Sequence, residues 1–212
     1  MNIQTIPYHS YEKGLPQEGN FIIGQKRDNN IIVYQAFNNQ IADYAVAKQR
    51  FGGQNYSFSR MTWIKPNFLW MMYRCGWAEK ENQNRVLAIE MSLEGFEELL
   101  DKGVLTRFDK SYGAESDWVE CLNKSDVRIQ WDPDHNPQGE KLRRRAVQIG
   151  IKGNALQQFN NEFIKSITDI TDFVKQQKIN MVENEEAFLV ADESIIEINS
   201  LLKEKFSIPG SV

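Results

Sequence analysis

Residues that could bind an anion gather around one short stretch of the sequence. Arg60 and Thr62 are two residues apart in a run of β-formers, so in a strand they would lie on one face. Lys65 directly precedes Pro66, a residue typical of the first turn of a helix. Because a helix N-terminus exposes free N–H groups and a positive dipole end, a lysine there favours a phosphate or carboxylate ligand. A solvated arginine on an edge strand and a surface lysine at an ordinary helix start are the alternative interpretations.

Three further residues are candidates to line the same cleft. Arg74 lies in an apolar helical run, where a guanidinium needs either a structural carboxylate partner or a polar pocket. Gln148 lies between Ala146 and Gly150 on one face of a predicted strand, which is typical of a groove floor or of a tightly packed helix contact. Tyr34 could stack on a base, or could be a core residue with a satisfied hydroxyl.

Several other chemistries are not supported. The chain has only two histidines, and His135 falls in a predicted turn with Asp132 and Asp134, so no metal site is predicted. The sequence contains no P-loop, no glycine-rich dinucleotide fingerprint and no nucleophile elbow. Its two cysteines, Cys75 and Cys121, do not have disulfide-framework or zinc-site spacing, and we expect both to be reduced and unlinked.

Composition indicates an ordinary folded protein. The 212 residues are 41% hydrophobic and 25% charged, with a net charge of −4 and a pI of about 5.4. Since nucleic-acid binders usually carry a basic excess, RNA contact would depend on a local cluster, for which Arg143, Arg144 and Arg145 are the candidates. No signal-peptide pattern and no membrane-length apolar run are found, and we expect a cytoplasmic protein.

The elements that must position these residues follow from periodicity and from glycine and proline placement. Strands are predicted at 31–37, 56–64, 85–91, 127–131, 144–151 and 187–190; helices at 40–51, 66–77, 93–102, 118–122 and 154–177; and a turn-rich loop at 132–137. The 66–77 helix, rich in Trp and Met, is apolar on nearly every face and is expected to be buried. Residues 1–20 are predicted as an irregular arm, and 21–212 as a single domain. The fold class is α+β, with a mixed, mainly antiparallel and possibly split sheet packed with helices.

Three sequence blocks carry a family resemblance. They are 33–37 (VYQAF) with Ile41-Ala42, 60–74 (RMTWIKPNFLWMMYR) and 145–150 (RAVQIG). Together they resemble the family known as domain of unknown function 4291, over roughly residues 20–195. The central block is long and unusual in composition, which makes the match specific. The family name implies no activity.

A weaker resemblance, to the split sheet of ADP-ribosyltransferase-like folds, implies NAD as a cofactor. Those enzymes bind NAD through polar residues on separate strands. The glutamate that they typically use for catalysis has no clear counterpart here, and Gln148 is the candidate stand-in. Three hypotheses therefore stand: an NAD-using enzyme, a non-catalytic binder of nucleotide, nucleic acid or another anion, and a protein-interaction domain.

Overall fold

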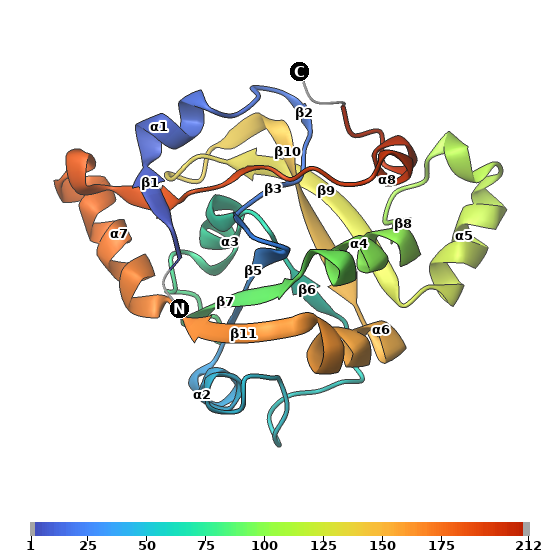
Figure 1. The fold of residues 1–212 in the computed structure, drawn as a ribbon, viewed down its shortest axis with the longest axis horizontal. Helices are drawn as coiled ribbons and strands as arrows, with labels where there is room; N and C mark the ends of the chain where they lie inside the picture. The colour runs from blue at the N-terminus through green and yellow to red at the C-terminus, as the bar shows by residue number, and fades with distance from the viewer. Residues whose placement is uncertain (1–2, 210–212) are drawn as a thin grey trace.

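The computed structural model describes residues 3–209 and contains two main β-sheets. The four-stranded sheet has the order β11(Ile164–Asp169), β7(Arg85–Ser92), β5(Asn30–Phe37), β4(Lys26–Arg27), and all its neighbours are antiparallel. The five-stranded sheet has the order β2(Gly19–Asn20), β10(Lys141–Ile151), β9(Val127–His135), β8(Gly103–Leu105), with β6(Thr62–Ile64) also on β10. In it β2 and β8 pair in parallel with their neighbours. The prediction of an α+β fold with mainly antiparallel sheets is confirmed (Figure 1).

The two sheets meet where β5 approaches β6. Tyr34 and Lys65 form an isolated antiparallel bridge, in which the Tyr34 N–H donates to the Lys65 carbonyl oxygen at 2.7 Å and the Lys65 N–H donates to that of Tyr34 at 3.3 Å. β6 pairs with β10 on its other side, so one short segment belongs to both sheets. Residues of both sheets can therefore converge near Lys65.

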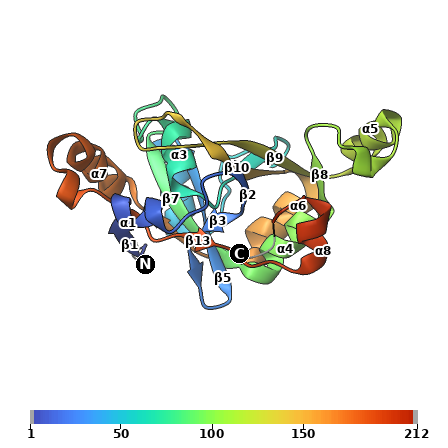
Figure 2. The ribbon, with the colours of Figure 1, turned by 90° about the horizontal axis from the view of Figure 1, so that it is seen from above.

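Alternate residues of the four-stranded sheet enter two separate cores. Ile31 and Val33 of β5 pack with the five-stranded sheet and with the helices α2(Asn39–Lys48), α4(Leu93–Lys102) and α6(Gly153–Gln158). Ile32 and Tyr34 point the other way, into a core that includes α1(Tyr8–Lys13), α3(Phe68–Cys75) and α7(Thr171–Glu183). Seen from above, α7 and α5(Glu115–Lys124) lie at opposite ends of the molecule (Figure 2).

The Trp- and Met-rich helix is α3, and it is shorter than the predicted 66–77. Asn67 caps its start by accepting a hydrogen bond from the Trp70 N–H at 2.6 Å, and Gly76, with φ 59°, ends it. Six of its eight residues are buried. However, Tyr73 and Arg74 are exposed, so one strip of the helix does face solvent.

We expect Leu69→Ala to lower the free energy of unfolding by about 3 kcal/mol, because the deleted methyl groups leave a cavity as well as lost transfer energy. Leu69 is 1% exposed and belongs to the core beneath α3. Urea denaturation would measure the change, with Leu201→Ala on the exposed side of α8(Ser200–Lys205) as a control expected to be near neutral. An unchanged denaturation midpoint for Leu69→Ala would contradict the central position of α3.

The predicted helix at 154–177 is wrong. The segment consists of α6, a π-helical turn at Phe159–Phe163, strand β11 and the start of α7. Residues 164–171 read IKSITDIT, a β-branched run that disfavours a helix and fits a pleated edge. Pairing of β11 with β7 completes the sheet and outweighs the helical spacing of the apolar residues.

Three other predictions are corrected in the same way. The N-terminal arm is ordered among its described residues: β1(Thr5–Pro7) pairs with β12(Leu189–Ala191), α1 follows, and β2 joins β10. The loop predicted at 132–137 is mostly strand, because β9 continues to His135 before a turn that ends at Gly139. Of the strand predicted at 56–64, only Thr62–Ile64 is formed.

The two cysteines and the apolar character of the helices were also the subject of predictions. Cys75 is buried and Cys121 exposed, and both are free thiols, as expected. None of the helices in residues 3–209 has the length and apolar character needed to cross a membrane.

Candidate ligand-binding site

A cavity of about 430 Å³ opens at the junction of the two sheets, beside α3. We refer to it as the polar pocket. It is lined by Gln35, Ala36, Phe37, Met61, Thr62, Trp63, Lys65, Met71, Arg74, Gln83, Gln130 and Gln148. Four residues predicted from the sequence, Thr62, Lys65, Arg74 and Gln148, therefore lie around one cavity.

Lys65 is the residue of the pocket with the most perturbed environment. It is only 5% exposed, and none of the described carboxylates forms an ion pair with it. Its Nζ donates one hydrogen bond, to the Trp63 carbonyl oxygen at 3.2 Å, and lies 5.1 Å from the centroid of the Trp70 ring. Burial, and secondly the positive charge of Arg74, lower the pKa of Lys65 to about 7. The expectation of a surface lysine is thus excluded.

Gln35 and Thr62 form one polar wall. Gln35 Nε2 donates to Thr62 Oγ1 at 2.6 Å and to the Trp63 carbonyl oxygen at 3.1 Å. Gln35 Oε1 is buried and has no hydrogen-bond partner among the described residues. A buried acceptor without a partner is costly, so this oxygen is available to a donor group of a ligand.

A second polar part of the site is an amide–carboxylate cluster on strands β9 and β10 of the five-stranded sheet. Gln130 and Gln148 are cross-strand neighbours, and each donates to Asp132, at 2.9 Å and 2.7 Å. The negative charge of Asp132 acts on Lys65 by raising its pKa, against the larger effect of burial. Gln148 is thereby oriented by Asp132 rather than free.

Sequence reasoning missed Gln35, Gln130 and Asp132. Gln130 and Asp132 share a face of β9 with Arg128, a pattern of alternating polar residues that was present in the sequence. Because the Asp-Pro-Asp segment is typical of a turn, the sequence does not indicate that the strand and its alternation continue to Asp132. Tyr34 and Gln35 lie on opposite faces of their strand, and no local sequence signal decides which of the two faces a cleft.

Arg74 reaches the pocket from the exposed strip of α3. Its Nη1 donates to Gln83 Oε1 at 3.4 Å, and no ion pair involving it is found in the described part of the chain. Arg74 therefore has no structural salt bridge among the described residues, and its side chain is exposed rather than buried in apolar surroundings. It is an available cation at the edge of the pocket.

Two residues that were predicted to line the site, Tyr34 and Arg60, do not line the pocket. Tyr34 is 0% exposed, packs edge-on against Phe68 at 5.6 Å and does not line the pocket. Arg60 precedes β6, is exposed and is not among the lining residues. Its predicted alignment with Thr62 required a longer strand than the one that forms.

A match to a model of a known protein family shows which family the chain belongs to. Residues 21–196 match the family described as Domain of unknown function (DUF4291). The chain belongs to this family. Comparison with curated proteins gives no match.

In this DUF4291 chain the start of α3 already has an internal partner, the carboxyl group of Glu193. Glu193 accepts hydrogen bonds from the Phe68 N–H at 2.8 Å, from the Tyr11 hydroxyl at 3.2 Å and from Asn67 Nδ2 at 3.4 Å. Burial raises the pKa of Glu193 well above its ordinary value. At this helix start the Phe68 N–H is therefore occupied by a side chain of the protein itself, and the candidate site is the pocket beside Lys65.

Gly150, one of the two small neighbours of Gln148, is itself closely covered by side chains. A Cβ at Gly150 would lie 2.7 Å from Met61 Sδ and 2.9 Å from the Trp63 ring, so those side chains fill the space. The glycine is required by this close approach, and the cavity lies beside Gln148 rather than above Gly150.

No group of three or more potential metal ligands occurs among residues 3–209. His135 is buried in β9 and stacks on Tyr73, with ring centroids 3.5 Å apart and an interplanar angle of 9°. It is therefore part of the packing beside α3, in a strand and not in a turn.

Proposed function

We propose that the polar pocket binds a small nucleotide-like ligand through its anionic part, with NAD as the first candidate. The observation that carries the proposal is the buried Lys65 ammonium, which has no carboxylate partner among the described residues and opens onto a cavity next to Arg74. Two neighbouring cations destabilise each other, and a phosphate placed between them would relieve this repulsion. The volume of about 430 Å³ suits a ligand of nucleotide size.

The remaining lining residues suit the uncharged part of such a ligand. Gln35 Oε1 can accept a hydrogen bond from a ribose hydroxyl or an amide, and Thr62 and Gln148 provide further polar contacts. These polar residues come from separate strands, which is the arrangement that the resemblance to ADP-ribosyltransferase-like folds implies for NAD binding.

An NAD-using enzyme of ADP-ribosyltransferase-like type remains the second candidate function. Gln148 cannot act as a general base, and Asp132 is engaged by two glutamines. Burial lowers the pKa of Lys65 to about 7, so this residue is suited to proton transfer near neutral pH. A non-catalytic nucleotide-binding module needs none of these catalytic features.

Isothermal titration calorimetry with NAD, ADP-ribose and ATP tests the proposal. We expect Lys65→Met to weaken binding roughly ten- to a hundredfold, as for the loss of a charged hydrogen bond, and Arg74→Gln to weaken it less because Arg74 is exposed. Arg60→Ala is a matched control, since this exposed arginine is near Thr62 in sequence but does not line the pocket. Equal affinity for Lys65→Met and the natural protein would place the site elsewhere, and no binding by the natural protein would favour the protein-interaction hypothesis.

The affinity should also depend on pH. A bound anion favours the charged lysine and raises its pKa, so affinity is highest below pH 7 and falls as the pH rises above 7. At pH 7 binding should take up about half a proton, measurable from titrations in buffers of different ionisation enthalpy. Lys65→Met should abolish both effects, and a pH-independent affinity with no proton uptake in the natural protein would contradict the role of Lys65.

A further inference from the structure

A second concave region lies on the other face of the five-stranded sheet. Alternation along β9 and β10 places Gln130 and Gln148 on the pocket side and Trp131 and Arg145 on the opposite side. There, two cavities of about 280 and 610 Å³ adjoin, because both are lined by Asn20 and Arg145. We refer to them together as the cationic groove.

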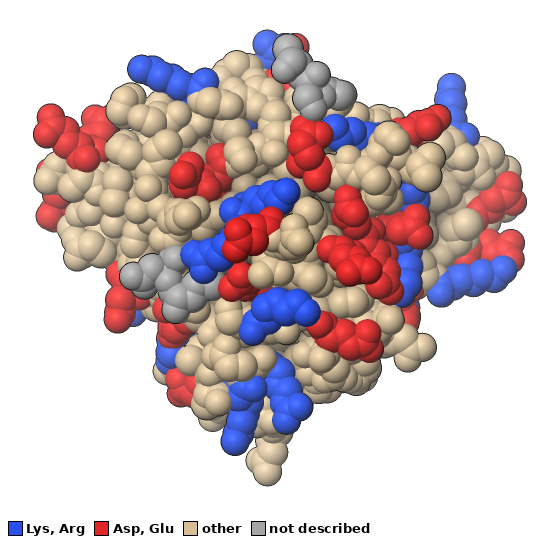
Figure 3. Space-filling model, viewed as in Figure 1, with Lys and Arg blue, Asp and Glu red and all other residues tan. Residues whose placement is uncertain are grey.

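The groove is positive although the protein is negative. Its lining residues include five cationic side chains, Arg107, Lys141, Arg143, Arg145 and Lys205, against two acidic ones, Glu18 and Asp109. The whole chain has a net charge of −4. On the face shown in Figure 3 neither sign dominates, and acidic side chains gather over α4. Local reversal of charge along a groove favours a polyanion.

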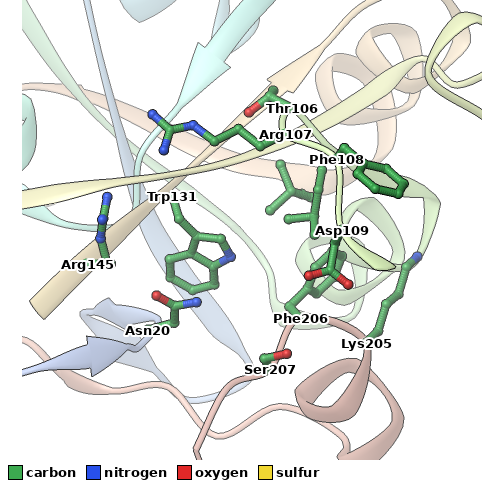
Figure 4. A pocket seen from close by; sticks show the side chains of 12 residues that line it. Asn20, Thr106, Arg107, Phe108, Asp109, Trp131, Arg145, Lys205, Phe206 and Ser207 are labelled. Carbon is green, nitrogen blue, oxygen red and sulfur yellow. The ribbon is translucent and has the colours of Figure 1, made fainter. Parts of the chain in front are cut away.

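Two of the arginines that line the groove are available to a ligand. Arg107 and Arg145 form no ion pair or side-chain hydrogen bond in the described structure, whereas Arg143 pairs with Glu18 and Lys205 donates to the Asp101 carbonyl oxygen. Figure 4 shows the Trp131 indole between these two arginines, with Arg145 to its left, Arg107 above it and Asn20 below it.

Arg144, the third arginine of the basic cluster, is not available. It is 1% exposed and pairs with Glu12 and Asp134. Of the three arginines predicted from the sequence as candidates for RNA contact, Arg144 is therefore buried, whereas Arg143 and Arg145 line the groove together with Arg107.

Aromatic groups accompany these cations. Phe108 is 41% exposed, unusually high for a phenylalanine, and lies edge-on to Trp118 at 6.1 Å. Trp131 has a buried Nε1 with no acceptor among the described residues. Proteins that bind single strands combine a cationic path for phosphates with aromatic rings on which unstacked bases lie.

We propose that the cationic groove binds single-stranded nucleic acid, with phosphates on Arg107 and Arg145 and a base against Phe108. A duplex keeps its bases stacked and cannot offer one to Phe108, so single strands should bind more tightly. This proposal does not rest on the ligand of the polar pocket, which lies on the opposite face of the sheet.

Fluorescence anisotropy with labelled 12-nucleotide single-stranded RNA and DNA, and a duplex of the same sequence, tests it at several salt concentrations. We expect Arg107→Gln and Arg145→Gln each to weaken single-strand binding about tenfold and to reduce the log–log salt slope by about 0.7. Phe108→Ala should weaken it about fivefold or more. These side chains are not core residues, and circular dichroism would verify folding.

Arg50→Gln is the matched control, because Arg50 is exposed and lines neither the groove nor the polar pocket. The groove variants should leave nucleotide binding in the polar pocket unchanged, and Lys65→Met should leave single-strand binding unchanged. The proposals for the two sites can therefore be contradicted independently of each other. Absence of single-strand binding at low salt, equal affinity for the duplex, or equal loss in Arg50→Gln would overturn the proposal.

Discussion

Replacing Arg144 by methionine is expected to lower the free energy of unfolding by about 3–5 kcal/mol, because it leaves a buried carboxylate without its partner. Arg144 Nε donates to Asp134 Oδ2 at 2.6 Å, and Asp134 is 0% exposed. Nη1 and Nη2 donate to the two carboxylate oxygens of Glu12 at 2.7 and 2.8 Å, which ties α1 to β10.

The loss should be smaller in acid. Burial already raises the pKa of Asp134, and removing the Arg144 cation would raise it further. The folded variant would then bind a proton that the unfolded chain, with an ordinary aspartate pKa of about 3.9, does not, so its stability falls as the pH rises above about 4. Urea denaturation of both proteins at pH 5 and pH 7 would show the larger difference at pH 7.

Arg143→Met is the control for this prediction. Arg143 is exposed and pairs only with Glu18, also exposed, and such surface pairs contribute about 0–1 kcal/mol. If Arg144→Met had as little effect as Arg143→Met, the Arg144 network would have no structural role.

Replacing Lys65 by methionine is expected to have the opposite sign and to stabilise the protein by about 1–4 kcal/mol at pH 7. Lys65 is 5% exposed and without an ion-pair partner among the described residues, and the fall of its pKa to about 7 reflects the cost of burying the charge. Methionine has a similar length and no charge to desolvate. A gain in stability with a loss of ligand affinity is the pattern of a residue kept for function.

The pH dependence follows from the same shift. The unfolded chain holds the lysine proton up to about pH 10.4, whereas the folded state releases it near pH 7, so this group makes the natural protein more stable as the pH rises from 7 to about 10. The advantage of Lys65→Met should therefore shrink across that window. Thermal or urea denaturation at pH 7 and pH 9 would measure this difference in stability. Lys48→Met, at an exposed position of α2, is a control with an expected effect near zero. Destabilisation by Lys65→Met at pH 7 would show that Lys65 is a structural cation.

The sequence by itself determined the elements whose local signals agree with their environment. The 93–102 helix forms with the predicted bounds, because Ser92 caps it and its apolar stripe faces the core. The strand predicted at 85–91 forms as β7, since its continuous apolar run suits a strand with both faces buried. The unusual block around Lys65 also indicated both the family and one wall of the candidate site.

Tertiary structure decided what depends on distant partners. In residues 164–169 the β-branched side chains favour a strand while the spacing of the apolar residues favours a helix, and pairing with the edge of β7 decides for the strand. The sequence cluster at 143–145 separates into an exposed Arg143, a buried Arg144 and a groove-lining Arg145, because Glu12, more than a hundred residues away, supplies a carboxylate. Gln35 faces the pocket and Tyr34 the core for a similar reason: the side of β5 that α3 covers is fixed by packing, and a strand's period of two allows either choice.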